Sequence, residues 1–188
     1  REVVVDRARS NYETFKNHTA ILFWSLGNES YAGSNIAAMN KFYKDHDSSR
    51  LTHYEGVFHA PEFKKEISDL ESCMYLPPKE AEEYLQNPKK PLVECEYMHD
   101  MGNSDGGMGS YIKLIDKYPQ YMGGFIWDFI DQALFVHDPV SGQDVLRYGG
   151  DFDDRHSDYE FSGDGLMFAD RTPKPAMQEV RYYYGLHK

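Results

Sequence analysis

The chain has 188 residues, of which 20 are Lys or Arg and 31 are Asp or Glu, so its formal net charge at pH 7 is −11. This acidic balance argues against nucleic acid or an anionic membrane as a partner, because both need clustered basic side chains. Hydrophobic residues make up 40% of the chain and charged residues 27%, which is a globular composition, and no apolar run approaches the ~20 residues of a membrane span.

Predicted helices alternate with short predicted strands along the chain. Helices are predicted where apolar side chains recur every three to four residues, or where a proline opens an acidic first turn: residues 2–17, 33–46, 77–85, 107–117 and 174–186. Strands are predicted over residues 20–26, 51–54, 70–75, 92–95 and 123–127. The first strand is continuously apolar, which predicts burial on both faces. Residues 135–172 are predicted to be irregular.

The spacing of these strands predicts the fold class. Strands about 20–30 residues apart with helices between them are typical of βα units in a parallel α/β sheet or barrel. The predicted strands are fewer than eight, and a complete (β/α)8 barrel needs about 250 residues. We therefore expect one domain over residues 1–188, either a small open α/β sheet or the later part of a TIM barrel.

Polar side chains follow several of the strands. The first strand leads to Glu29, the second to Glu55, and the fourth carries Glu94 and Glu96. The carboxyl ends of parallel strands converge on one face, so carboxylates far apart in sequence can meet there. Two carboxylates across a sugar are what glycoside hydrolysis requires, one as proton donor and one as base or nucleophile. We predict Glu29 and Glu96 as this pair, less than about 10 Å apart, and Glu55 and Glu94 stay open as rivals.

Several blocks of sequence resemble glycoside hydrolase family 2, in the branch of the large bacterial β-galactosidases. Residues 25–30, Ser-Leu-Gly-Asn-Glu-Ser, resemble the acid/base motif, and residues 94–104, Glu-Cys-Glu-Tyr-Met-His-Asp-Met-Gly-Asn-Ser, resemble the nucleophile motif. Further matching blocks cover residues 124–132, 148–152 and 165–173. The resemblance implies the C-terminal portion of a catalytic TIM barrel, about strands 4–8, from a retaining β-galactosidase that hydrolyses terminal β-D-galactosides such as lactose.

The resemblance also implies roles for individual residues. Glu29 would be the general acid/base, Glu96 the nucleophile, and Tyr75 the tyrosine that assists beside the nucleophile. Asn28 would bind the 2-hydroxyl of the sugar, and His99 would bind galactose hydroxyls. Trp127 would be the apolar platform under the sugar.

Mg²⁺ and Na⁺ are the cofactors that the resemblance implies. Glu29 would also be a Mg²⁺ ligand, and Phe161 would offer its backbone carbonyl to Na⁺. Asp164 stands where the family pattern has an Asn as Na⁺ ligand, so it keeps an oxygen donor but adds a charge, and the use of Na⁺ stays open. The other Mg²⁺ ligands come from earlier segments of the family's barrel, which have no counterpart here.

The expected partners are a β-galactoside, and the rest of the barrel with its flanking domains or a complementing subunit, in an oligomeric full-length form. No signal peptide opens the sequence, so a cytoplasmic location is expected, with Cys73 and Cys95 as reduced, buried thiols. Two alternatives stay open. The chain could be a catalytically inactive barrel fragment that functions only with a complementing segment, or a non-catalytic carbohydrate-binding module.

Overall fold

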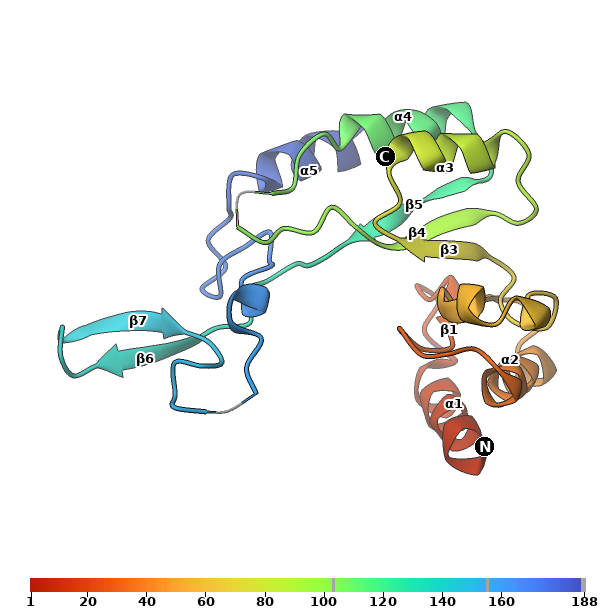
Figure 1. Ribbon diagram of the computed structural model, residues 1–188, viewed down its shortest axis with the longest axis horizontal. Helices are drawn as coiled ribbons and strands as arrows, with labels where there is room; N and C mark the ends of the chain where they lie inside the picture. Colours follow the sequence, from red (N-terminus) through yellow and green to blue (C-terminus); the bar gives the residue numbers. More distant parts are fainter. Residues whose placement is uncertain (103, 155, 187–188) are drawn as a thin grey trace. The chain divides into compact units, whose positions relative to one another are not determined.

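The computed structural model describes residues 1–102, 104–154 and 156–186 (Figure 1). Asn103, which belongs to the block over 94–104, lies outside the described residues. The chain forms two compact units. Unit 1 comprises Arg1–Cys95 and Tyr118–Met122, and unit 2 comprises Glu96–Lys117 and Gly123–Lys188. The boundary falls within β4 (Leu92–Tyr97) and β5 (Tyr121–Ile126), which begin in unit 1 and end in unit 2.

Unit 1 has an α/β pattern close to the predicted one. Its other elements are α1 (Glu2–Phe15), β1 (Phe23–Ser25), α2 (Ser34–His46), β2 (Leu51–His53), the 3₁₀ turns η1 (Gly56–His59) and η2 (Pro61–Phe63), β3 (Glu71–Met74) and α3 (Pro78–Leu85). β1 and β2 pair in parallel, with Trp24 opposite Thr52. The core of this unit gathers apolar side chains from the helices and strands, namely Ala8, Trp24, Leu26, Met39, Phe42, Tyr43, Tyr54, Val57 and Ile67.

The strands β3, β4 and β5 form one sheet in that order. At their beginnings, the Glu71 N–H donates to the Pro91 carbonyl at 2.9 Å, and the Leu92 N–H donates to the Gln120 carbonyl at 2.8 Å. Corresponding ends of neighbouring strands are therefore paired, so the strands run parallel, as β1 and β2 do. The predicted α/β class with parallel strands is confirmed.

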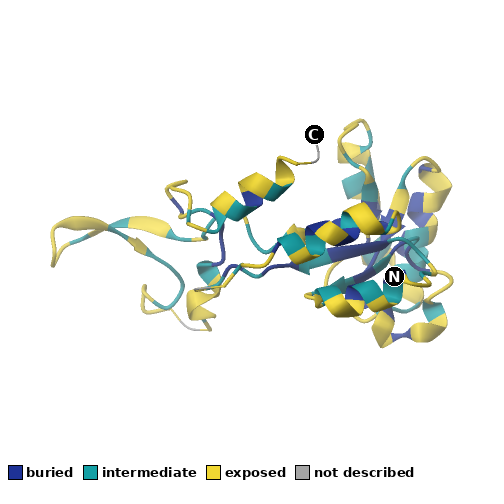
Figure 2. Ribbon diagram, turned by 90° about the horizontal axis from the view of Figure 1, so that it is seen from above, coloured by how far each residue is buried: buried dark blue, intermediate teal, exposed yellow. Residues whose placement is uncertain are grey.

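Unit 2 contains α4 (Gly109–Lys117), β6 (Leu134–Asp138), β7 (Gln143–Arg147), the 3₁₀ turn η3 (Tyr159–Ser162) and α5 (Met177–Tyr184). Its core comprises Tyr97, Met98, Met108, Ile112, Leu166 and Val180. β6 and β7 form an antiparallel hairpin in which Val136 lies opposite Val145. Figure 2 shows that most of the hairpin is exposed, in contrast to the buried residues of the α/β part.

Two expectations need correction. The prediction that residues 135–172 are irregular is wrong for the β6–β7 hairpin. Short apolar stretches at 134–136 and 145–146 lie on both sides of a turn at Asp138–Gly142, a weak signal for a hairpin that the Asp and Gly content obscured. The first strand is not buried on both faces: Trp24 is 2% exposed, but Phe23 and Ser25, whose side chains point to the other face of β1, are half-buried and exposed. Only the face that carries Trp24 packs in the core with α1 and α2.

The described cysteines, Cys73 and Cys95, are free, as expected. They are only partly buried, whereas full burial was expected. Within the described ranges, none of the helices combines the length and the apolar character needed to cross a membrane.

Candidate functional site

The loop after β1 carries Asn28 and Glu29, and both residues are exposed. Glu29 has a left-handed backbone conformation, with φ of 53°. Residues other than glycine rarely adopt it, because the Cβ atom crowds the neighbouring carbonyl. Contacts from the surrounding chain must therefore hold Glu29 in this conformation.

Three consecutive residues after β2 supply these contacts, and we call Tyr54–Gly56 the loop anchor. The Glu55 carboxylate accepts a hydrogen bond from the Glu29 N–H, and the Tyr54 hydroxyl donates to the Ser30 carbonyl. A Cβ added at Gly56 would lie 2.4 Å from the Ser30 carbonyl oxygen, so this close approach requires glycine. The anchor binds the main chain of the loop and leaves the Glu29 side chain exposed.

A buried histidine joins the strands beneath the loop. The His53 carbonyl accepts from the Leu26 N–H at 2.9 Å, while its ring nitrogens lie 3.0 Å from Ser25 Oγ and 2.8 Å from Ser72 Oγ. Burial lowers the pKa of His53 to about 4, so the imidazole is neutral at pH 7. β1, β2 and β3 are thus cross-linked by neutral hydrogen bonds through His53.

A cavity of about 440 Å³ lies beside Glu29. Its walls combine carboxylate, aromatic, imidazole and sulfur-containing side chains: Glu29, Glu55, Phe58, His59, Cys73 and Met74. Tyr75 comes directly after this wall at the end of β3, is 39% exposed, and has a left-handed backbone with φ of 53°. An apolar pocket with a few polar groups is typical of a site for a small molecule.

The structure separates the rival carboxylates from the predicted pair. Glu94 is 0% exposed, and its Oε1 accepts a hydrogen bond from the Tyr121 hydroxyl at 2.8 Å. Burial raises the pKa of Glu94 to about 7. Glu55 is also buried and holds the Glu29 backbone. Glu29 is exposed and Glu96 is half-buried, so the predicted pair has the greater access to a ligand.

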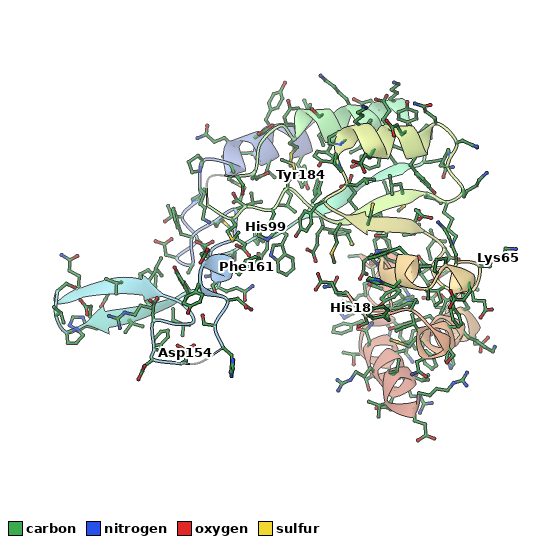
Figure 3. The ribbon with its side chains drawn as sticks, in the orientation of Figure 1. His18, Lys65, His99, Asp154, Phe161 and Tyr184 are labelled. Carbon is green, nitrogen blue, oxygen red and sulfur yellow. The ribbon has the colours of Figure 1, made fainter. Side chains whose placement is uncertain are left out.

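In unit 2, several predicted site residues meet around Asp164. The Trp127 indole N–H donates to Asp164 Oδ2 at 3.2 Å, and His99 Nε2 lies 3.8 Å from the same oxygen. The His99 ring contacts the Phe161 ring edge to face, with centroids 5.8 Å apart (Figure 3). The structure therefore brings the predicted sugar-binding residues His99 and Trp127 together with the predicted Na⁺ ligands Phe161 and Asp164.

Asp164 is deeply buried, and this burial raises the pKa of its carboxyl, although the hydrogen bond from Trp127 opposes the rise. Asp100 is also buried, which raises its pKa to about 6, and its N–H donates to the Trp127 carbonyl at 2.8 Å. Nearby, Lys174 Nζ lies 2.8 Å from Asp131 Oδ1 and supplies a positive charge. The carboxylates of Asp164 and Asp131 thus hold the side chains of Trp127 and Lys174 from the interior of unit 2.

The described residues do not form a complete metal site by themselves. Among them, no group of three or more His, Cys, Asp or Glu side chains could hold a metal ion. Glu29 can offer one oxygen ligand to Mg²⁺, but the described residues do not complete the donor set. Asp164 Oδ1 is buried and has no hydrogen-bond partner within the described ranges, so this oxygen fits a hard cation such as Na⁺.

The predicted site residues are divided between the two units. Unit 1 holds Asn28, Glu29 and Tyr75, and unit 2 holds Glu96, His99, Trp127, Phe161 and Asp164. That Glu29 and Glu96 face each other across a sugar stays a prediction. The sequence reasoning gave no role to Tyr54, Gly56 or Asp100. Their positions in the sequence could have pointed to them. Tyr54 and Gly56 flank the rival carboxylate Glu55, and Asp100 follows His99 in the nucleophile motif.

Comparison with known proteins places the chain in a family. The family model described as "Glycosyl hydrolases family 2, TIM barrel domain" matches residues 1–188. A β-galactosidase large subunit from Lactobacillus helveticus is 84% identical over 100% of this chain and 30% of its own length. A β-galactosidase from Halalkalibacterium halodurans is 56% identical over 97% of this chain and 18% of its own length. The chain therefore spans less than a third of these relatives.

Solved structures agree on the fold. A β-glucuronidase from an uncultured Clostridium species has a TM-score of 0.63 at 16% identity, over 98% of this chain and 36% of that one. A family 2 glycosyl hydrolase from Bacteroides cellulosilyticus has a TM-score of 0.66 at 15% identity, over 97% of this chain and 22% of that one. At these identities the likeness concerns the fold alone. By its family match and its fold, the chain belongs to the glycosyl hydrolases of family 2, in their TIM barrel domain.

Proposed function

We propose that the full-length protein containing this chain is a retaining β-galactosidase that hydrolyses terminal β-D-galactosides such as lactose. The observation that carries this proposal is the match to relatives named β-galactosidases, 56–84% identical over almost the whole chain. The placement of Glu29 after β1 and of Glu96 on β4 supports it, because active sites of such barrels lie at the carboxyl ends of the strands.

The proposed reaction is a double displacement. Glu29 gives its proton to the glycosidic oxygen while a Glu96 carboxylate oxygen attacks the anomeric carbon, so the bond to the leaving group breaks and a galactosyl ester forms. Glu29 then takes a proton from water, whose oxygen attacks the anomeric carbon and releases the Glu96 carboxylate. Tyr75 assists beside the nucleophile.

The proposed sugar ligands are Trp127 and His99 in unit 2 and Asn28 in unit 1. Trp127 offers an indole face, which suits the apolar face of a pyranose, and the hydrogen bond to Asp164 fixes the ring. His99 would bind galactose hydroxyls, and Asn28 would bind the 2-hydroxyl. Na⁺ would be held by the Phe161 carbonyl and Asp164, and Mg²⁺ by Glu29 with ligands from outside this chain. When bound, these cations supply positive charge that orients hydroxyls and carboxylates.

A trapping experiment tests the proposal. A 2-deoxy-2-fluoro-galactoside with a dinitrophenyl leaving group should label the full-length enzyme. Fluorine slows both formation and release of the covalent intermediate, and the dinitrophenyl group speeds only its formation, so the intermediate accumulates. Peptide mass mapping should find the label on Glu96, and the first sugar product of a normal substrate should be the β-anomer. Label on Glu94 or Glu55, or an α-anomeric product, would reject the assignment.

A second candidate is that this chain functions only with a complementing segment. It is favoured by the share of its relatives that the chain spans, 30%, and by the name large subunit given to the protein from Lactobacillus helveticus. Assays of the chain alone, and with the missing segments and a small subunit added, separate the two. Hydrolysis of a chromogenic galactoside by the chain alone would defeat this candidate.

A further inference from the structure

The direction in which the Glu29 side chain points depends on its unusual backbone conformation. The carboxyl of Glu29 must reach the glycosidic oxygen within hydrogen-bond distance, and a displacement of about 1 Å at a reacting group can cost 10²-fold in rate. Its side chain is exposed, so packing does not set its direction. The left-handed φ of 53° at Glu29 instead sets where the side chain leaves the main chain.

Glu55 supports this backbone position directly. Its Oε1 accepts the hydrogen bond from the Glu29 N–H, a charge-assisted bond that is stronger than one between neutral groups. Glu55 is 3% exposed, and its Oε2 is buried without a hydrogen-bond partner in the described part of the chain. Burying a carboxylate in this way costs free energy, so the Glu29 N–H is a principal compensation for it.

The segment around Glu55 is itself firmly held. Tyr54 is almost fully buried in the core of unit 1, and its N–H donates to Ser68 Oγ at 3.0 Å. Gly56 opens the turn η1 and lies against the Ser30 carbonyl. The loop anchor therefore connects a rigid core to the loop through main-chain contacts at two successive residues, Glu29 and Ser30.

We propose that Glu55 is a positioning residue that orients Glu29 for proton transfer by holding its backbone N–H. This inference rests on the proposed function, because it takes Glu29 as the acid/base. Glu55 contributes to the wall of the cavity beside Glu29, but its Oε1 is engaged by the Glu29 N–H and its side chain is buried. It acts on the reaction through Glu29.

The test uses the dependence of the reaction on its leaving group. A sugar or alkyl leaving group needs a proton to depart, whereas dinitrophenolate departs without one. The value of kcat/KM reports the first bond-breaking step. In the full-length enzyme, Glu55→Leu should lower kcat/KM about 100-fold for lactose and less than tenfold for dinitrophenyl β-galactoside. A loss of fold stability alone would lower both values equally.

Two conservative variants keep the test decisive even if Glu55→Leu folds poorly. Glu55→Gln retains an oxygen acceptor for the Glu29 N–H and should stay within about fivefold of the parent on both substrates. Glu55→Asp keeps the charge but withdraws the acceptor by one methylene, and should show the same selective loss for lactose. Glu62→Leu removes an exposed glutamate from η2 and serves as the matched control.

The outcomes separate the two proposals. Equal losses on both substrates, or unchanged activity in Glu55→Leu and Glu55→Asp, would overturn the positioning role. The proposed function fails separately if Glu29→Gln shows no selective loss for lactose. If Glu29→Gln is selective and the Glu55 variants are not, only the positioning inference is rejected.

Discussion

Unit 1 and unit 2 use buried carboxylates in opposite ways near their predicted site residues. In unit 1, Glu55 binds a backbone N–H and leaves the Glu29 side chain exposed. In unit 2, Asp164 binds the side chain of Trp127 and lies beside that of His99. A carboxyl that transfers a proton needs a fixed backbone and an accessible end of its side chain. Side chains that recognise a sugar need a fixed orientation. The difference matches the two roles proposed for these residues.

The largest expected effect separates a reacting carboxylate from a buried neighbour on the same strand. Glu96→Gln in the full-length enzyme should lower kcat on the order of 10⁴-fold, because an amide cannot attack the anomeric carbon. Glu94→Gln is the matched control, since Glu94 is enclosed and bonded to Tyr121. Hydrolysis of a nitrophenyl galactoside measures both, and a Glu96→Gln enzyme within tenfold of the parent would contradict the assignment.

A second prediction tests whether unit 1 is a scaffold. Asp47 accepts hydrogen bonds from Trp24 at 2.9 Å and Arg50 at 2.7 Å. Burial by itself would raise the pKa of Asp47, but hydrogen bonds from Ser49, Trp24 and Arg50 outweigh it and hold the pKa well below its ordinary value. Asp47→Ala should destabilise the protein by about 3 kcal/mol, because it leaves the Arg50 charge without its partner.

Thermal melting of the full-length protein measures this loss. The folded-state pKa is depressed, so the stabilisation by Asp47 is present above the unfolded pKa of about 4 and is lost as the pH falls below it. The difference between parent and variant should therefore shrink in acid. Asp45→Ala, which removes an exposed ion pair to Lys41, should cost less than about 1 kcal/mol. Equal melting temperatures for Asp47→Ala and the parent would refute the scaffold role.

A third prediction tests the side-chain use of a carboxylate in unit 2. Asp164→Ala removes the acceptor of the Trp127 indole N–H, so the ring loses its fixed orientation. We expect KM for a galactoside to rise about tenfold, the equivalent of about 1.4 kcal/mol, with a smaller change in kcat. Asp164→Asn keeps an oxygen acceptor and should remain near the parent. If KM is unchanged in Asp164→Ala, Asp164 does not orient the sugar platform.

A fourth prediction concerns pH and the buried Glu94. Burial raises its pKa to about 7, against about 4.3 in an unfolded chain. Its contribution to stability is therefore full below about pH 4 and is lost as the pH rises to about 7. Glu94→Gln cannot ionise, so relative to the parent it should gain stability between pH 5 and pH 8. Melting curves at pH 5 and pH 8 check this. The buried His53 is present in both proteins, so it does not contribute to the difference between them. A pH-independent difference would show that Glu94 is ionised throughout.

The local sequence pattern was sufficient to predict the order of the helices and of the strands β1 to β5. Apolar spacing located the helices, and short apolar runs located β1 to β5, because both signals depend on residues that are neighbours in sequence. The motifs at the ends of these strands were also enough to identify the family, which the whole-chain match confirms. The hairpin over β6 and β7 was missed, because its apolar stretches are short and do not alternate with polar residues, and its turn is rich in residues that also occur in loops.

Burial and partnership were decided by the tertiary structure. Glu29, Glu55, Glu94 and Glu96 look alike in the sequence, but only packing encloses Glu55 and Glu94. Glu94 owes its raised pKa to its enclosure and has its hydroxyl partner at Tyr121, and Glu55 meets Glu29 from the following strand. A pattern of residues records where a carboxylate stands on its own strand. The segments that shield it from water and supply its hydrogen-bond partner lie far along the chain.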